Sequence, residues 1–432
     1  MTADLVFVAT ADLSAQVRGR AVPVADESGV LRTGTGWVPA NLALDAFGAI
    51  APGNVFGSVG DLRLLPDPAS RAEIPADGDY PGVRIYLADQ VQLDGSSWGG
   101  CPRTFLRSAL DDLQRATGLQ VVASFEHEFF LDGLSSSGPF TFSRLRGAEP
   151  FGSDLVRLLD DAGLQPENWL PEYGTDQFEI TLKPAAGLVA ADRAVLLKEL
   201  VRDLARRRGL RASFAPVRDE AGSGCGVHIH FSLRDGEGRP VLHDPSHPAG
   251  LSDRGIAFAA GILAHADALL AWTAPSPASF VRLRPHRWSA GASYLADRDR
   301  EALLRICPTT TLGDKDLADQ FNLEFRGADA TANPFLALAV LIRAGLEGLK
   351  GAYAAPTVWP EGTDEPTLRA AGVPPLPSGL PDALLALEKD DVVRGWFAPD
   401  LLATHLAVKR NELAHVAGLT TAEMLTAVAD VY

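Results

Sequence analysis

The sequence predicts an α+β protein of two unequal domains, and its length and its local patterns lead to this prediction. A chain of 432 residues is long for a single hydrophobic core. Its first part contains short strand-like runs separated by Gly, Pro and Asp, whereas its second part alternates such runs with amphipathic helical stretches. We place the boundary near Gly100, which gives domains at residues 1–100 and 101–432.

The N-terminal domain is predicted to consist mainly of strands. The run LVFVAT favours a first strand, residues 17–20 favour a turn, and AVPV favours the start of a second strand. Further strand-like runs occur in GDLRLLPDP and GVRIYLADQV, each bounded by turn-forming residues. Little helix is expected here apart from a turn in NLALDAFGAI.

The larger domain is predicted to open with a helix. After Pro102, the run TFLRSALDDLQRATG has apolar residues at helical spacing and ends at a glycine. Similar patterns predict helices in SDLVRLLDDAG, in AVLLKELVRDLARRRG and after Asn333 and Pro334. Strands are predicted in VVASFEHEFFL, in FEITL and in the segment that ends HIHFSL.

Charge and cysteine content restrict the possible partners. The net charge of −16 argues against a nucleic-acid partner and offers no basic patch to a membrane. The three cysteines, Cys101, Cys225 and Cys307, are scattered, which fits a reducing compartment. No apolar stretch is long enough to span a bilayer, and the N-terminus lacks the pattern of a signal peptide. We therefore expect a cytoplasmic protein.

The strand VVASFEHEFFL carries two carboxylates on one face. Glu126 and Glu128 alternate with His127, so the two acids point to the same side and the histidine to the other. Like charges on a half-buried face repel each other unless a cation or a proton lies between them. An isolated pair of this kind can also be a solvated strand face, but comparable clusters recur three more times along the chain.

The three further clusters lie in PEYGTDQFEI, GSGCGVHIHFS and NLEFRGADATANPF. They contribute two carboxylates around a bend, two histidines on one strand face, and an acid and a base on another strand: Glu172, Glu179, His228, His230, Glu324 and Arg326. A histidine pair at this spacing can equally be an ordinary core or surface feature. The glycines of GSGCGVHIHFS match neither dinucleotide-binding nor P-loop motifs, but they can bring backbone amides close to a ligand.

An arginine series lies between the histidines and the last cluster. It comprises Arg282, Arg284, Arg298, Arg300 and Arg305, which could form either a solvated basic face or a clamp for phosphate and carboxylate groups. Carboxylate oxygens with an imidazole suit Mg²⁺ or Mn²⁺. Cys225 and His228 resemble half of a zinc site, but no cysteine pair is present to complete it, so zinc is disfavoured. The residues thus indicate a metal-dependent enzyme that handles phosphate.

In their order along the chain, these segments resemble the motifs of the glutamine synthetase superfamily. The segments that carry the resemblance are SFEHEFFL, PEYGTDQFEI, GSGCGVHIHFS, FVRLRP and NLEFRGADATANPF, together with ADLSAQVRGRAVP and GDLRLLPDP in the N-terminal domain. The resemblance implies a small β-grasp domain followed by a catalytic α+β domain with a curved antiparallel sheet. It also implies homo-oligomeric rings of six subunits, often paired as dodecamers, in which a neighbour's N-terminal domain completes each site.

The resemblance also implies a role for each matching residue. One Mg²⁺ or Mn²⁺ ion would be held by Glu128, Glu172 and Glu179, and a second, which bridges the ATP phosphates, by Glu126, His228 and Glu324. The glutamate substrate would contact Gly224, Arg282 and Arg326, whereas His230 and Ser232 would lie on the nucleotide side. The residues expected to act in catalysis are Arg282, Arg300 and Arg305, the last two through contacts with ATP and the transferring phosphoryl group.

The chain departs from the family pattern at the amine end of the site. Ammonia-using members carry a glutamate after the RL motif, where this chain has RPHRWSAG with Trp288 at the aligned position. An indole cannot accept a proton but can line an apolar or cation-accepting substrate pocket. The N-terminal acid of the ammonium site has only Asp45 and Asp61 as candidates.

These departures favour a γ-glutamyl-amine ligase. ATP would phosphorylate the γ-carboxylate of glutamate, and a monoamine, a polyamine or an amino alcohol would then attack the acyl phosphate. Two alternatives remain open at this point: a glutamine synthetase that uses ammonia, and a structural member of the family without catalysis. A structural member would be expected to lose metal carboxylates, and all five aligned glutamates are present here.

Overall fold

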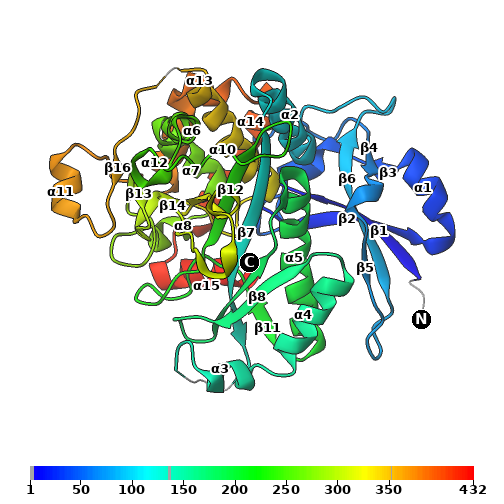
Figure 1. The fold of residues 1–432 in the computed structure, drawn as a ribbon. Coiled ribbons are helices and arrows are strands. Elements are labelled where there is room, and N and C mark those ends of the chain that lie inside the picture. Colours follow the sequence, from blue (N-terminus) through cyan, green and yellow to red (C-terminus); the bar gives the residue numbers. More distant parts are fainter. Residues whose placement is uncertain (1–3, 135–137, 352) are drawn as a thin grey trace.

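The N-terminal part of the protein forms a six-stranded sheet (Figure 1), in a computed structural model that describes residues 4–134, 138–351 and 353–432. The strand order is β2-β1-β6-β4-β3, with β5 paired to β6. Strand β1 runs parallel to β6, and the other pairs are antiparallel. The elements are β1 (Leu5–Ala11), β2 (Val17–Pro23), α1 (Glu27–Thr33), β3 (Thr35–Trp37), β4 (Leu62–Pro66), β5 (Ala72–Ile74) and β6 (Val83–Val91).

The prediction of a strand-rich N-terminal part is confirmed, but two local predictions were wrong. Residues 17–20 belong to strand β2 rather than to a turn. The turn lies before them, where the carboxylate of Asp12 accepts hydrogen bonds of 2.9 Å from the backbone N–H groups of Ser14 and Gln16. Helix α1 was not predicted, because Val30 is its one buried residue and an apolar periodicity is therefore lacking.

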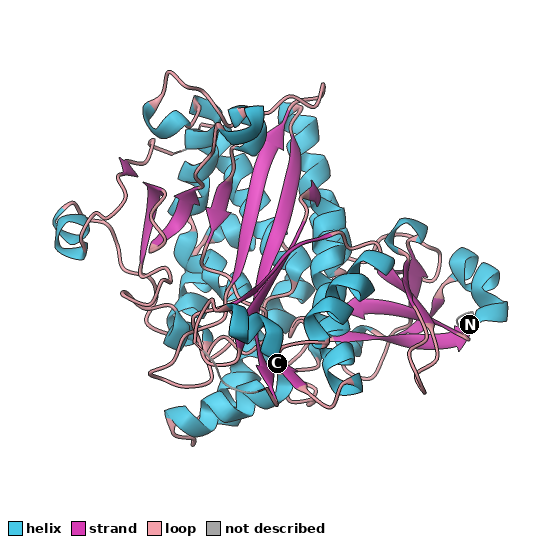
Figure 2. Ribbon diagram, turned by 60° about the horizontal axis from the view of Figure 1, so that its bottom comes forward, coloured by secondary structure: helices cyan, strands magenta, loops and turns pink. Residues whose placement is uncertain are grey.

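The larger part of the protein is built on a ten-stranded sheet (Figure 2). Its order is β16-β13-β14-β15-β12-β7-β9-β8, and the short strands β10 and β11 also pair with β7. The pairs are antiparallel except that β13 runs parallel to β14 and β16, so the sheet is mixed at one edge. The strands are β7 (Gln120–Asp132), β8 (Pro166–Pro171), β9 (Gln177–Leu182), β10 (Ala185–Ala186), β11 (Arg211–Ser213), β12 (Val227–Arg234), β13 (Ala292–Asp297), β14 (Ala302–Ile306), β15 (Leu323–Phe325) and β16 (Val358–Trp359).

Helices cover one face of this sheet. Helices α2 (Pro102–Thr117) and α5 (Gly187–Arg207) pack on β7, and α10 (Pro334–Leu349) contacts α2, α5, α6 (Asp253–Ala264) and α7 (Ala266–Thr273). The apolar side chains of β7, such as Phe125 and Phe129, are buried in this core. Because side chains alternate along a strand, Glu126 and Glu128 point to the opposite face.

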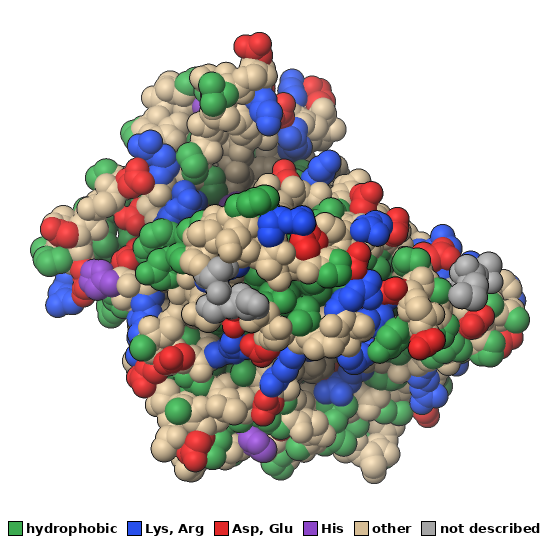
Figure 3. Space-filling view, turned by 90° about the horizontal axis from the view of Figure 1, so that it is seen from below, with side chains coloured by type: hydrophobic (Ala, Val, Ile, Leu, Met, Phe, Trp, Pro, Cys, Tyr) green, Lys and Arg blue, Asp and Glu red, His purple; other side chains and the backbone are tan. Residues whose placement is uncertain are grey.

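The remaining helices surround this core. They are α3 (Phe142–Gly147), α4 (Phe151–Asp161), α8 (Ser279–Arg282), α9 (Leu317–Gln320), α11 (Glu365–Ala370), α12 (Leu380–Lys389), α13 (Asp391–Arg394), α14 (Pro399–Val416) and α15 (Thr421–Val431). No single described helix has the length and apolar character needed to cross a membrane, although α6 and α7, bent by 77°, meet that test as a pair. On the face seen in Figure 3, acidic and basic side chains are interspersed.

Buried ion pairs join the two parts of the protein. Arg103 at the start of α2 is 2% exposed and bonds both carboxylate oxygens of Asp192 on α5 at 2.8 Å. It also donates to Asp67 and Asp89 of the N-terminal part at 2.8 and 3.0 Å. A guanidinium that serves three carboxylates at once fixes the orientation of the smaller sheet relative to α5.

Candidate active site

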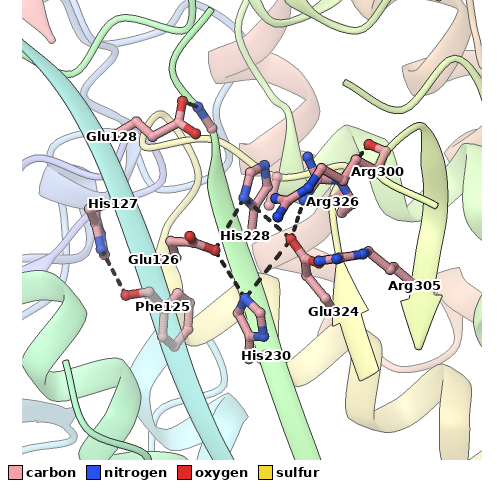
Figure 4. Close-up of polar contacts among 12 residues, drawn as sticks. Phe125, Glu126, His127, Glu128, His228, His230, Arg300, Arg305, Glu324 and Arg326 are labelled. Carbon is pink, nitrogen blue, oxygen red and sulfur yellow. Dashed lines mark hydrogen bonds and ion pairs between the residues drawn. The ribbon is translucent and has the colours of Figure 1, made fainter. Parts of the chain in front are cut away.

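Strand register brings together residues that are far apart in the sequence. In the sheet, Glu126 lies opposite His228, and Glu128 lies opposite Glu179. Residue Glu324 of β15 lies opposite both His230 and Arg305. Because residues opposite each other in a sheet share a face, these side chains form one polar row on the face that the helices leave open. Figure 4 shows Glu126, His228, His230 and Glu324 pointing toward one another.

The first cluster contains two carboxylates and two imidazoles. His228 Nδ1 lies 3.4 Å from Glu126 Oε2 and 3.4 Å from Glu324 Oε1, and His230 Nε2 lies 3.0 Å from Glu126 Oε2. Glu126, His230 and Glu324 each offer one possible metal-ligand atom, and these atoms all lie within 4.8 Å of one another. Among the described residues, this is the group of His, Cys, Asp or Glu side chains close enough to share a metal ion. Oxygen donors with an imidazole fit a divalent cation such as Mg²⁺ or Mn²⁺.

Basic neighbours compensate the charge of this first cluster. Burial alone would raise the pKa of Glu126, but hydrogen bonds from His228 and His230 outweigh burial and lower it. Burial is likewise outweighed at Glu324, whose pKa falls to about 2 beside Arg326 and the two histidines. Arg305 Nη1 donates to Glu324 Oε2 at 2.8 Å. Both carboxylates are therefore ionised at neutral pH.

His230 belongs with the carboxylates in the structure. Its Nδ1 lies 3.0 Å from the side-chain oxygen of Asn322, whose amide nitrogen donates to Gln320 O. Its Nε2 donates to Glu126 Oε2 at 3.0 Å. Because the acceptor at Nδ1 can keep a proton there, Nε2 could give up its own proton and serve as a metal ligand. The resemblance implies that His230 lies on the nucleotide side, and in the structure its ring also contacts the carboxylate of Glu126.

The second cluster consists of Glu128, Glu172 and Glu179, none of which forms an ion pair with a described basic residue. Burial, with the nearby charges of Glu172 and Glu126, raises the pKa of Glu128 to about 8 despite a 2.9 Å hydrogen bond from the N–H of Gly226. Burial and the adjacent carboxylates also raise the pKa of Glu179, and burial raises that of Glu172. Three crowded carboxylates that no described base pairs directly fit a hard divalent cation.

Two cavities open on either side of the polar row. One, of about 540 Å³, is lined by Glu126, His230, Ser232, Arg300, Arg305 and Glu324. The other, of about 480 Å³, is lined by Glu128, Glu172, Gly224, His228, Arg282 and Trp288. The residues predicted on the nucleotide side therefore share the first cavity, which we call the nucleotide-side cavity. Most of the predicted substrate residues share the second, the substrate-side cavity.

Gly224 and Arg282 depend on each other in the substrate-side cavity. A Cβ at Gly224 would lie 2.4 Å from Arg282 Cγ and 2.9 Å from Pro216 O, so only glycine lets the arginine lie here. Arg282 is buried and donates to Ala328 O at 2.7 Å, whereas its buried Nε has no partner among the described residues. A buried guanidinium with an unused donor suits the binding of a carboxylate.

Arg326 lines neither of these cavities. Its Nε donates to Arg300 O at 2.7 Å, its Nη2 donates to Trp288 O at 3.0 Å, and its Nη1 contacts Glu324. The structure thus gives Arg326 contacts that fix two loops and a carboxylate at the edge of the site. The N-terminal candidate Asp45 is fully buried and bonds Ala49 N and Asn411 within its own chain, whereas Asp61 is exposed.

Two contributors to the site were not found from the sequence. Arg144 of α3 is buried and its Nη1 donates to the carbonyls of Glu172 and Gly174, both at 2.6 Å, so it holds the bend that carries Glu172. Tyr173 lines the substrate-side cavity beside Trp288. Arg144 lies outside the motifs, and Tyr173 lies within PEYGTDQFEI but was not singled out there, so only their position in the fold shows their contacts.

Comparisons with known proteins agree with this geometry. The glutamine synthetase N-terminal domain matches residues 2–98, and the glutamine synthetase catalytic domain matches residues 99–426. The γ-glutamylpolyamine synthetase GlnA3 of Streptomyces coelicolor is 34% identical over 96% of this chain and 90% of its own. A glutamine synthetase of Methanocaldococcus jannaschii is 28% identical over 82% of this chain and 79% of its own.

Solved structures give the same result. A crystal structure of a novel glutamine synthase homologue is 42% identical, with a TM-score of 0.93 over 100% of this chain and 99% of that one. An ADP complex of GmaS is 25% identical, with a TM-score of 0.84 over 99% of this chain and 97% of that one. With both family domains matched across almost its whole length, this chain is a member of the glutamine synthetase family of ligases.

Proposed function

We propose that this protein is an ATP-dependent ligase that joins the γ-carboxylate of glutamate to an amine. The observation that carries the proposal is that Trp288 lines the substrate-side cavity together with Glu172. An indole offers an incoming amine an apolar surface and a π-face but no base. The similarity to the γ-glutamylpolyamine synthetase GlnA3 supports the same choice.

The residues of the two cavities divide the work of phosphoryl transfer. Arg300 and Arg305 would bind phosphate oxygens in the nucleotide-side cavity, and Arg282 with the backbone at Gly224 would hold a substrate carboxylate in the other cavity. The polar row between the cavities is where the γ-carboxylate would meet the phosphoryl group. Mg²⁺ or Mn²⁺ bound by the two clusters would supply charge neutralisation to the phosphate oxygens.

The amine then displaces phosphate from the acyl phosphate. Its nitrogen attacks the γ-carbonyl carbon, the C–N bond forms, and phosphate leaves with the electrons of the broken C–O bond. The proton lost from the nitrogen goes to the departing phosphate, so that an amide and hydrogen phosphate are formed. Arginines that have already ordered around the phosphoryl oxygens stabilise the charge that develops there without further rearrangement. An amine that covers the exposed aromatic rings would exclude water from the intermediate.

A glutamine synthetase that uses ammonia is the second candidate, because several relatives at 28–31% identity are named glutamine synthetases. Phosphate release from ATP and glutamate, measured with ammonia, methylamine, ethanolamine, putrescine and spermine, separates the two. The proposal expects a higher kcat/KM with at least one amine than with ammonia. Activity with ammonia alone would contradict it.

We also propose the surroundings in which this reaction takes place. The protein would be cytoplasmic and would use ATP with Mg²⁺ or Mn²⁺. It would assemble into rings of six subunits, single or paired, with the domain at residues 1–100 contributing to a neighbour's site. Native mass spectrometry tests the assembly, and a monomer that is active at assay concentration would contradict it.

A further inference from the structure

Two aromatic side chains from separate segments meet at the mouth of the substrate-side cavity. Tyr173 lies in the bend between β8 and β9, and Trp288 lies in the loop that follows α8. Their ring centroids are 6.3 Å apart at an interplanar angle of 29°. Tyr173 is 63% exposed and Trp288 66% exposed, so both rings present most of their surface to solvent while lining the cavity.

The backbone under each ring is held firmly in place. Arg144 donates to the carbonyls on both sides of Tyr173, those of Glu172 and Gly174. Arg326 donates to the carbonyl of Trp288, whose φ is +53°. The two rings are therefore displayed by fixed backbone, and a ligand that covers them would bury apolar surface with little loss of backbone entropy.

The aromatic faces favour a cation at the mouth of the cavity. Glu128 and Glu172 line the same cavity. Arg282, His286 and Arg287 line it as well, and Arg287 is held by hydrogen bonds to Gly222 O and Glu220 O. A cation close to an aromatic face is attracted by the ring quadrupole, and an alkyl chain can lie along the same face.

We propose that Tyr173, together with Trp288, forms the subsite for the acceptor and selects alkyl ammonium compounds with a chain long enough to contact both rings, such as diamines and polyamines. This inference rests on the proposed amine ligase activity and adds a residue that decides which amines are used. We assign the specificity to Tyr173 because it adjoins Glu172, to whose carboxylate its backbone N–H donates, so that its ring lies next to a carboxylate of the same cavity.

The test compares kcat/KM for ammonia, methylamine, putrescine and spermidine in the full-length enzyme and its variants. Tyr173→Leu and Trp288→Leu are each expected to lower kcat/KM for putrescine about 3- to 30-fold, the range of a cation–π contact. Methylamine, which is too short to contact both rings, should lose less than about threefold. Tyr173→Phe, which keeps the ring, should remain within about threefold of the wild type for every acceptor.

Controls separate a subsite from a structural role. Phe142→Leu removes an aromatic ring that is 75% exposed and lies outside the cavity, and it should change no acceptor constant. The KM values for glutamate and ATP should stay within about twofold in all variants. Size-exclusion chromatography at assay concentration should show the same assembly for Tyr173→Leu as for the wild type.

The outcomes are distinguishable. Amine activity in the wild type with unchanged acceptor preference in Tyr173→Leu overturns the subsite and leaves the proposed function standing. Equal losses for ammonia, methylamine and putrescine, or a changed assembly, also overturn it, since they show a structural or intersubunit role for the ring. A wild type that uses ammonia alone overturns the proposed function and the subsite together.

Discussion

Glu128 is expected to destabilise the metal-free protein as the pH rises. Its side chain is half-buried beside two other carboxylates, and its pKa is raised from 4.5 to about 8, first by burial and then by the charges of Glu172 and Glu126. The folded protein therefore keeps a proton on Glu128 that the unfolded chain releases near pH 4.5. Stability must fall between these two values and reach its minimum above about pH 8.

The size of the effect follows from the pKa difference. At 1.36 kcal/mol per unit, the full shift corresponds to about 5 kcal/mol, an upper value because part of it is repulsion that the neighbouring carboxylates can relieve by taking up the proton themselves. Between about pH 6 and about pH 8, the same slope lowers the free energy of unfolding by about 3 kcal/mol. Glu128→Gln keeps the shape and can still accept the N–H of Gly226, but it has no charge to desolvate.

The assay is urea unfolding of the metal-free protein in the presence of a chelator, at about pH 6 and about pH 8.5. Between these two pH values, the free energy of unfolding of the wild type should fall by about 3 kcal/mol more than that of Glu128→Gln. Millimolar Mg²⁺ should remove most of the difference, since a cation replaces the proton between the carboxylates. Glu237→Gln, which removes an exposed carboxylate, should behave like the wild type. Parallel losses in wild type and Glu128→Gln would refute the reasoning.

Three further substitutions test other parts of the structure. Arg144→Met should raise the Mn²⁺ concentration needed for thermal stabilisation about 10- to 100-fold, with partial recovery in Arg144→Lys, because it releases the bend that carries Glu172; an unchanged midpoint would exclude a positioning role. Gly224→Ala should raise the KM for glutamate at least about tenfold and the KM for ATP far less, because its Cβ displaces Arg282; equal changes would argue against the division into two cavities. Arg103→Met should lower the free energy of unfolding by about 3–5 kcal/mol in a urea titration, because it leaves buried carboxylates uncompensated, and a loss below about 1 kcal/mol would show that the aspartates reach water instead.

The sequence allowed much of the site to be predicted because its strands alternate strongly. Glu126 and Glu128 stand out in an apolar run of period two, and the same period puts His228 and His230 on one face. Strand register could not be predicted in this way, since Glu126 and His228 lie about a hundred residues apart and meet only through the pairing of β7 with β12. Short elements such as α1 were missed because one buried residue makes no pattern.

Contacts to backbone carbonyls were beyond sequence reasoning for a different reason. Arg144 acts on the carbonyls of Glu172 and Gly174, and Arg326 acts on those of Trp288 and Arg300. A carbonyl is present at every residue, so its use leaves no trace in the residue types around it. The carbonyl contacts of these arginines are found only once the fold shows which loops they reach.

The two acidic clusters differ in what the protein itself supplies, and this difference has a chemical consequence. Glu126 and Glu324 already face two imidazoles and two guanidiniums, so a cation that binds there competes with positive charge and gains most when phosphate oxygens arrive with it. Glu128, Glu172 and Glu179 form no ion pair with a described base, and their mutual repulsion and burial raise their pKa values, so a cation that binds there removes repulsion at once. The second cluster should therefore be filled at lower metal concentration than the first. The bases around Glu324 would make the nucleotide-side cavity depend on metal and nucleotide together, which couples the activation of the carboxylate to the presence of ATP.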